Sequence, residues 1–180
     1  LFAWGPHFVK NIFNSYPSLA TFNIGYPSDH YFKKQEMKAR TLRDKYPGKF
    51  ILSYQDNTLA NDIPYSRNMQ LAIHEMFIDI LNKNDQIVLF LKPKRFSSYS
   101  ILAKEIPRIK ELIESERIVF FIGENERTKA VPAMIGMASD LAIGMGISTA
   151  ASECYFAGTL SFLADLTGFK NNEFGNKGLG

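Results

Sequence analysis

The sequence has very little cysteine: Cys154 is the one cysteine among 180 residues. A disulfide within the chain is therefore excluded, and such a composition is typical of a reducing compartment. Cys154 lies in the apolar run Cys154-Tyr155-Phe156-Ala157, with no histidine near it in the sequence. A nucleophilic role is the alternative, but we expect a buried, unreactive thiol at this position.

Long apolar runs and charge of one sign are also missing. No run approaches the roughly 18 apolar residues that a membrane-spanning helix needs. The 21 basic and 18 acidic residues leave a formal net charge of +3. These charges are spread along the chain without a basic stripe, so a nucleic-acid partner is not supported. His, Cys and carboxylate residues show no metal-ligand spacing, and neither a Walker loop nor a Gly-x-Gly-x-x-Gly motif precedes a helix.

The two ends of the sequence resemble cut ends. Leu1-Phe2-Ala3-Trp4-Gly5 has neither an initiator Met nor the layout of a signal peptide. Residues 175–180 end without a helix cap or a core element. We therefore expect a fragment of a longer protein, truncated at both ends.

What the sequence does have is an alternation of apolar runs and amphipathic segments from residue 49 onward. Runs that are apolar throughout predict strands buried on both faces, and the helical spacing between them predicts helices that join parallel strands. The predicted strands are 50–54, 86–92, 118–122, 140–144 and 160–166, and the predicted helices are 64–81, 98–116 with a break at Pro107, 129–138 and 147–157. The fold class is α/β, a Rossmann-like parallel sheet with helices on both faces.

The predicted sheet domain covers residues 49–168. We interpret residues 1–27 as the end of a preceding domain, with a short strand at 22–27. Residues 28–48 are interpreted as a hinge or linker with a solvated, Lys- and Arg-rich helix that ends at Pro47-Gly48. Residues 169–180 are a truncated C-terminal tail.

Candidate site residues follow the ends of the predicted strands, because open parallel sheets bind ligands at their carboxyl edge. They are Gln55 and Asp56 after the first strand, Lys92, Lys94 and Arg95 after the second, Gly123, Glu124 and Asn125 after the third, and Gly146, Ser148 and Thr149 after the fourth, with Glu153 one turn further.

Ser148 and Thr149 have two readings that are compatible with each other. They can cap the helix that follows, or they can add hydroxyl donors to a helix N-terminus that binds a phosphate. Glu153 can then accept hydrogen bonds from two neighbouring sugar hydroxyls.

The three cations after the second strand favour a pyrophosphate site on the same edge, and a solvated strand end is the alternative. His74 lies in the middle of an amphipathic helix, and we interpret it as a structural or surface residue.

The segment Asp140-Leu141-Ala142-Ile143-Gly144, followed by Ile147-Ser148-Thr149-Ala150, Glu153 and Ala157-Gly158, resembles a signature of GT-B-type glycosyltransferases. That signature, "aDlvig…St…E…aG.p", belongs to their C-terminal domain. Leu91-Lys92-Pro93-Lys94 resembles the "iKPHP" segment of bacterial capsule and surface-polysaccharide transferases, with Lys94 in place of the His. Trp4-Gly5 and residues 24–29 resemble the last strand and exit of the N-terminal, acceptor-binding domain.

The resemblance implies transfer of a sugar from a nucleotide-sugar to a glycan or lipid-linked acceptor in bacterial polysaccharide biosynthesis. We assign Lys92, Lys94, Arg95, Gly146, Ser148 and Thr149 to the donor phosphates, Glu153, Gln55 and Asp56 to the ribose or sugar, and Gly123, Glu124 and Asn125 to the base. No metal or cofactor is expected, because the nucleotide-sugar is a substrate. The catalytic base would come from the N-terminal domain, so this chain is expected to bind without turnover.

The expected partners are the nucleotide-sugar donor and a glycan or lipid-linked acceptor. We expect a cytoplasmic location, with peripheral association at the inner face of the membrane, and the sequence gives no indication of an oligomeric state.

Three other functions share this architecture or its ligands. They are a nucleotide-sugar epimerase of the GT-B type, a teichoic-acid-like transferase of a polyol phosphate with a CDP-linked donor, and a non-catalytic nucleotide- or glycan-binding module. A Rossmann-like domain without a ligand is the structural alternative.

Overall fold

The computed structural model describes residues 2–3, 10, 14, 17–23, 25–26, 29–56, 66–95, 97–121, 131–146 and 148–164. The chain divides into two compact units, Leu1–Gln35 and Glu36–Gly180. This boundary falls inside the segment 28–48, and a hinge role for that segment stays a prediction. In the first unit, strand β1 (Phe2–Ala3) pairs in parallel with β2 (Phe22–Asn23), which lies within the predicted segment 22–27.

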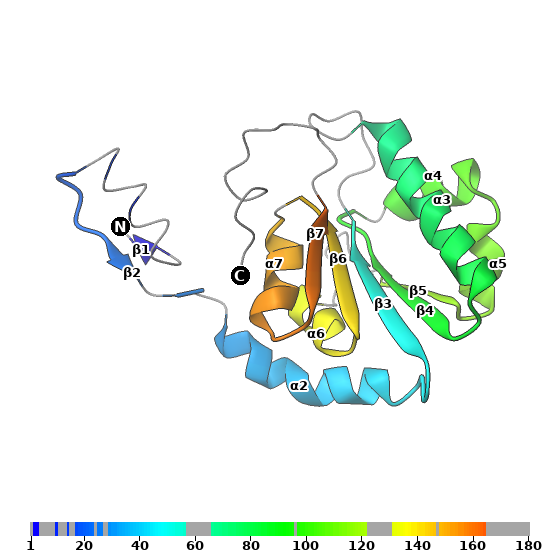
Figure 1. Cartoon of the computed structure of the whole chain (residues 1–180), viewed down its shortest axis with the longest axis horizontal. Helices are drawn as coiled ribbons and strands as arrows, with labels where there is room; N and C mark the ends of the chain where they lie inside the picture. Colours follow the sequence, from blue (N-terminus) through cyan, green and yellow to red (C-terminus); the bar gives the residue numbers. More distant parts are fainter. Residues whose placement is uncertain are drawn as a thin grey trace. The chain divides into compact units, whose positions relative to one another are not determined.

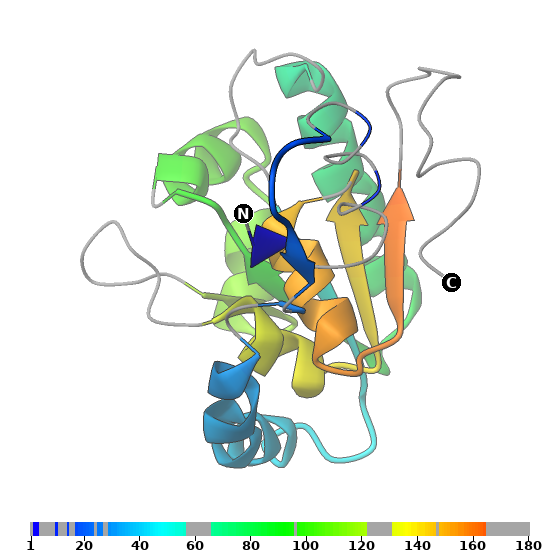
Figure 2. The same ribbon diagram turned by 90° about the vertical axis from the view of Figure 1, so that its left-hand side faces the viewer.

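The second unit is built on a parallel five-stranded sheet. Its strands are β3 (Phe50–Gln55), β4 (Ile87–Lys92), β5 (Ile118–Phe120), β6 (Leu141–Met145) and β7 (Ser161–Ala164). Their order in the sheet is β5-β4-β3-β6-β7, and every neighbouring pair is parallel. Figure 2 shows β6 and β7 running side by side in the same direction. The strand order reverses between β3 and β6, which is the doubly wound, Rossmann-like arrangement that the sequence predicts.

Helices cover both faces of this sheet (Figure 1). The described helices are α2 (His30–Arg43), α3 (Arg67–Lys83), α4 (Ser97–Glu105), α5 (Ile109–Glu114), α6 (Pro132–Met137) and α7 (Thr149–Phe156). The predicted break at Pro107 is confirmed, because α4 ends at Glu105 and α5 begins at Ile109. Within the described residues, none of the helices is long and apolar enough to cross a membrane.

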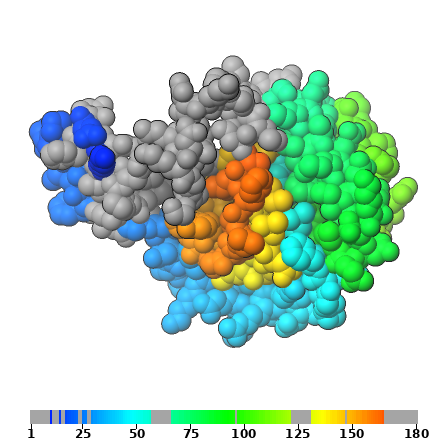
Figure 3. All heavy atoms as spheres, viewed as in Figure 1, coloured from blue at the N-terminus to red at the C-terminus, as the bar shows by residue number. Residues whose placement is uncertain are grey.

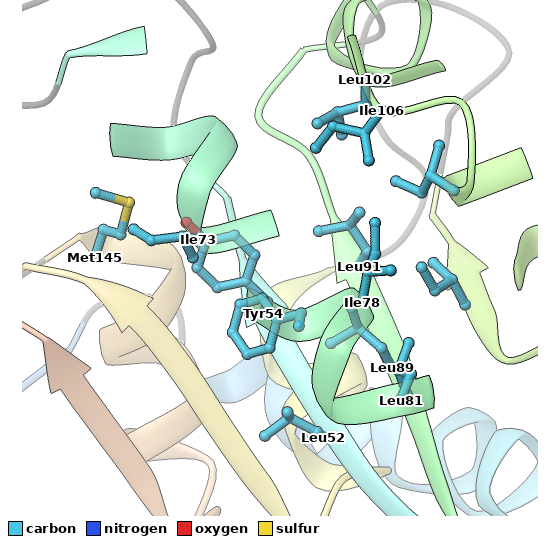
Figure 4. Packing of buried hydrophobic residues seen from close by; sticks show 13 residues of the cluster. Leu52, Tyr54, Ile73, Ile78, Leu81, Leu89, Leu91, Leu102, Ile106 and Met145 are labelled. Atoms are coloured by element: carbon cyan, nitrogen blue, oxygen red, sulfur yellow. The ribbon is translucent and has the colours of Figure 1, made fainter. Parts of the chain in front are cut away.

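The larger core lies between the sheet and helices α3, α4 and α5. Leu52 and Tyr54 of β3 and Leu91 of β4 pack with Ile78 and Leu81 of α3, all with 6% exposure or less (Figure 4). Alternate residues of β3 enter this core because successive side chains of a strand point to opposite faces. Each such side chain contributes about 1.5–3 kcal/mol by leaving water.

The smaller core lies on the other face of the sheet. Ile51 of β3 and Phe90 of β4 pack there with Ile135 of α6 and with Ala39 of α2. The helix that the sequence analysis expects to be solvated therefore buries one side, with Ala39 only 2% exposed. The dense Lys and Arg content of α2 hides this contact in the sequence, because Ala39 and the partly buried Leu42 are its apolar side chains.

Candidate functional site

Three strands end together at the carboxyl edge of the sheet, and their last residues form a row. Gln55 of β3 lies opposite Lys92 of β4 on one side and opposite Gly144 of β6 on the other. Residues paired in this way point to the same face of a sheet. Gly144 faces α7, so the row Lys92–Gln55–Gly144 lies on the face that α7 covers.

Helix α7 packs very closely on this row. A Cβ atom on Gly144 would overlap the Cβ of Ala151, and a Cβ on Gly136 of α6 would lie 2.8 Å from the Cβ of Cys154. Real Cβ atoms do not approach so closely, so two glycines allow α7 to contact both β6 and α6. The close approach that Gly144 permits is therefore that of α7 to β6.

The turn into α7 has the geometry of a capped helix. Gly146 adopts a left-handed conformation with φ of 59°, which costs glycine little. Ser148 is the N-cap, and its Oγ accepts a hydrogen bond of 3.2 Å from the backbone N of Ala151. The capping interpretation of Ser148 is confirmed. Because a hydroxyl that accepts can still donate, a role in phosphate binding stays a prediction for Ser148 and for the exposed Thr149.

Lys92 and Glu153 act on each other electrostatically. Burial lowers the pKa of the Lys92 ammonium, and the neighbouring Glu153 carboxylate and Cys154 oppose that shift. The sequence assigns Lys92 to phosphate and Glu153 to sugar, and the structure places the Glu153 carboxylate near enough to act on the Lys92 ammonium. A neighbouring carboxylate favours the charged form of a partly buried lysine, which burial alone makes costly.

Cys154 has the properties expected of a structural thiol. Burial raises the pKa of Cys154 to about 12, so the group stays protonated at neutral pH. Its Sγ lies 3.4 Å from the carbonyl oxygens of Pro132 and Ala150. The expectation of a buried cysteine is confirmed, and the lack of reactivity stays a prediction that the raised pKa supports.

Gln55 is the most unusual polar residue of the row. It is 1% exposed, and neither its Nε2 nor its Oε1 has a hydrogen-bond partner within the part of the chain that the structure describes. Leaving a buried polar group without a partner costs about 1–3 kcal/mol. The Gln55 amide carries this desolvation cost beside Lys92 and close to the turn into α7. It is therefore a strong candidate for a ligand contact.

Asp56, the next residue, points to the opposite face of the sheet. Its Oδ1 lies 4.0 Å from Nε2 of His74 in α3, and both side chains are at most 1% exposed. Nδ1 of His74 lies 2.7 Å from the carbonyl oxygen of Gln70, so Nδ1 carries the proton and donates it. Burial lowers the pKa of His74 to about 4, and the hydrogen bond to Gln70 opposes only part of that shift.

The Asp56–His74 contact was not found by sequence reasoning. His74 is buried, which agrees with the structural and not with the surface interpretation. Asp56 is eighteen positions away in the sequence, and its contact with His74 depends on how α3 packs on β3. The shared ribose or sugar role of Gln55 and Asp56 stays a prediction, although the sheet separates the two side chains.

The other candidate residues are only partly described. Lys94 and Arg95 are exposed just after β4. Gly123, Glu124 and Asn125 lie outside the described residues. Among the described residues, no group of three or more His, Cys, Asp or Glu is placed to hold a metal ion.

No protein-family model and no curated protein matches this sequence. A solved structure with a similar fold is that of the wall teichoic acid polymerase TagF, with a TM-score of 0.53 and 14% sequence identity. The match covers 91% of this chain and 38% of TagF. The fold is GT-B-like. The sheet order and the two helical layers agree with that assignment, which extends to the fold and not to a particular polysaccharide.

A second solved structure is less similar. The N-terminal domain of the Candida albicans trehalose-6-phosphate phosphatase matches with a TM-score of 0.49 and 16% identity over 76% of this chain and 32% of that one. A similarity this low supports no argument. The chain spans 38% of the length of TagF, so the similarity does not establish the activity of a complete protein.

Proposed function

We propose that this chain is the donor-binding domain of a GT-B-type glycosyltransferase that handles a nucleotide-sugar. The observation that supports this most directly is Gln55, whose buried amide has no partner among the described residues and lies between Lys92 and Gly144. This row is at the carboxyl edge of a doubly wound sheet beside the strand-order reversal, which is where such sheets bind ligands.

The proposed roles follow from chemistry and position. The free backbone N–H groups at the start of α7 and the hydroxyls of Ser148 and Thr149 bind the donor phosphates, with Gly146 forming the turn. Lys92, Lys94 and Arg95 supply positive charge. Gln55 and Glu153 bind hydroxyl groups, because an amide both donates and accepts and a carboxylate accepts twice.

In the proposed reaction, an acceptor hydroxyl oxygen bonds to the anomeric carbon while the bond from that carbon to the diphosphate oxygen breaks. The nucleoside diphosphate leaves with the electron pair, and the hydroxyl proton passes to a base that we place in another part of the complete protein. The cations at this edge stabilise the developing charge on the diphosphate.

The similarity to TagF favours one second candidate, a transferase of a polyol phosphate from a CDP-linked donor. There the acceptor oxygen bonds to the distal phosphorus, the bridging P–O bond breaks, and CMP leaves. The two candidates therefore differ in the product that the domain must hold, a nucleoside diphosphate in one case and CMP in the other.

A nucleotide panel tests both candidates. UDP, GDP, CDP, ADP and CMP are compared by thermal shift and by calorimetry, with wild type, Glu153→Ala and the matched control Glu111→Ala on the exposed side of α5. Stabilisation by one nucleoside diphosphate, lost in Glu153→Ala and kept in Glu111→Ala, supports the glycosyltransferase. A preference for CMP supports the second candidate, and no response to any nucleotide at millimolar concentration contradicts both.

A further inference from the structure

The positive charge of this protein is concentrated in one short segment. Residues 30–49 contain seven basic and two acidic residues, a net charge of +5, so the other 160 residues together carry −2. Most of this charge is in α2 (His30–Arg43). The expectation that the charges are spread along the chain is therefore wrong for residues 30–49, which carry +5 beside a remainder with a net charge of only −2.

The cations of α2 gather on one face of the helix. At 100° per residue, Lys33, Lys34, Lys38 and Arg40 surround Met37 on the side opposite the buried Ala39. We call these five residues (Lys33, Lys34, Met37, Lys38 and Arg40) the basic face. All five are exposed, and Met37 is 79% exposed.

The cations of the basic face have no carboxylate partner within the described part of the chain, although Lys34 Nζ lies 5.5 Å from the centroid of the Tyr31 ring. Among the residues that the structure describes, none of its four cations forms an ion pair. Arg43, on the other side of α2, is instead bound to Asp140 at 2.7 Å. Arg43, on the inward side of α2, is paired, whereas the four outward cations form no ion pair with a described residue. This difference indicates a face that is available for an external anionic partner.

The second half of α2 is held firmly to the sheet domain. Asp140 accepts from Arg43 and also from the backbone N of Ile51, each at 2.7 Å. Ala39 adds an apolar contact from the same side of the helix. In the space-filling view, residues 36–49 lie at the surface of the second unit, in blue to cyan (Figure 3). The basic face is therefore already presented as a helix, and binding requires no folding step.

We propose that the basic face of α2 binds the surface of an anionic lipid bilayer. Four ammonium and guanidinium groups on one side of a helix match a plane of anionic headgroups, and each contributes about 1 kcal/mol near such a surface. Met37 lies at the centre, where an apolar side chain can enter the interface. Charge supplies most of the attraction, because Met37 is the one apolar side chain of this face.

This surface is separate from the candidate ligand site. Asp140 and Ile51 are at the starting edge of β6 and β3, whereas Gln55, Lys92 and Gly144 are at the carboxyl edge. The second half of α2 is thus anchored at the edge of the sheet opposite to the candidate ligand site. The inference does not depend on the proposed function, and each can fail without the other.

The test is flotation of the full chain with vesicles. Phosphatidylcholine vesicles with about 30 mole per cent phosphatidylglycerol are compared with pure phosphatidylcholine, at low and high salt. The variants are Lys33→Gln/Lys34→Gln/Lys38→Gln and a matched control, Lys83→Gln/Lys104→Gln/Lys110→Gln, which removes the same charge from exposed positions on α3, α4 and α5. Circular dichroism and the thermal shift with nucleotide report on folding and on the ligand site.

We expect binding to the anionic vesicles alone, weakened by salt, reduced about a hundredfold by the α2 triple variant and reduced much less by the control. Met37→Ser is expected to weaken binding further at high salt, where charge is screened. Equal losses in the two triple variants would overturn the proposal, because net charge would then explain the binding. Failure to bind anionic vesicles would also overturn the proposal. So would tighter binding to RNA than to vesicles, if the α2 triple variant weakened the RNA binding to the same extent.

Discussion

Replacement of Gln55 by methionine is expected to make the unliganded protein more stable and to remove its response to nucleotide. Methionine has nearly the same length and shape but no amide. The buried amide has no partner among the described residues, so its removal relieves a desolvation cost of about 1–3 kcal/mol. For a protein of this size, a gain of about 2 kcal/mol raises the Tm by roughly 4–8 °C.

Ser53 provides a matched control for this effect. It lies two residues earlier on the same face of β3, is fully buried, and its hydroxyl also has no hydrogen-bond partner among the described residues. Ser53→Ala should also raise stability, but it should leave the nucleotide response unchanged because Ser53 is farther from the carboxyl edge. Chemical denaturation and thermal shift, each with and without the nucleotide that stabilises the wild type, measure both quantities.

The reasoning is refuted if Gln55→Met lowers the Tm by several degrees while Ser53→Ala does not. That result would mean that the amide makes hydrogen bonds in the free protein and serves the fold. A stable Gln55→Met protein that still responds fully to nucleotide would refute the binding role alone, since the amide would then be a tolerated defect of the core.

Three further predictions follow from pKa values and from packing. Burial holds the pKa of His74 at about 4, below the usual 6.5, so the unfolded chain takes up this proton first as the pH falls. About 2 kcal/mol of stability should be lost between pH 8 and pH 5, with a smaller loss in His74→Leu when urea unfolding is followed across that range. Gly144→Ala should cost about 1–3 kcal/mol by overpacking against Ala151, and adding Ala151→Gly should restore most of it. Cys154 should react with thiol reagents at pH 8 on the order of a thousandfold more slowly in the native protein than in urea, and rapid native labelling would contradict its burial.

The order of elements in the second unit could be predicted from the sequence because each strand has a strong local signal. Residues 51–55 are buried without interruption, which is why apolar side chains occur on both faces of this strand, Ile51 on one and Leu52 and Tyr54 on the other. Helix boundaries were less accurate. The first predicted helix was expected from residue 64, but α3 begins at Arg67 with Ser66 as its N-cap. A polar cap followed by Arg67 and Asn68 gives a weaker signal than the apolar stripe that comes after them.

The candidate site was predictable as a set of strand ends but not as a geometry. Gln55 and Asp56 are adjacent in sequence, and alternation along β3 sends one towards α7 and the other towards His74 of α3. Their faces could be assigned in principle, because Ile51 and Gln55 are an even number of residues apart. The electrostatic contact of Lys92 with Glu153 could not, since it depends on how closely two glycines allow α7 to pack.

Two charged side chains at the starting edge of the sheet make several hydrogen bonds, whereas the Gln55 amide at the carboxyl edge has none to a described residue. At the starting edge, the Arg117 guanidinium donates to the carbonyls of Leu81, Asn84 and Ile87 and to the carboxylate of Asp85. Asp140 similarly accepts from two donors. At the carboxyl edge, the Gln55 amide is buried without a described partner. For stability alone, an apolar side chain at position 55 would serve as well as the buried Gln55 amide. A ligand that completes its hydrogen bonds gives a physical reason to retain it, because binding energy then offsets a cost that the free protein carries.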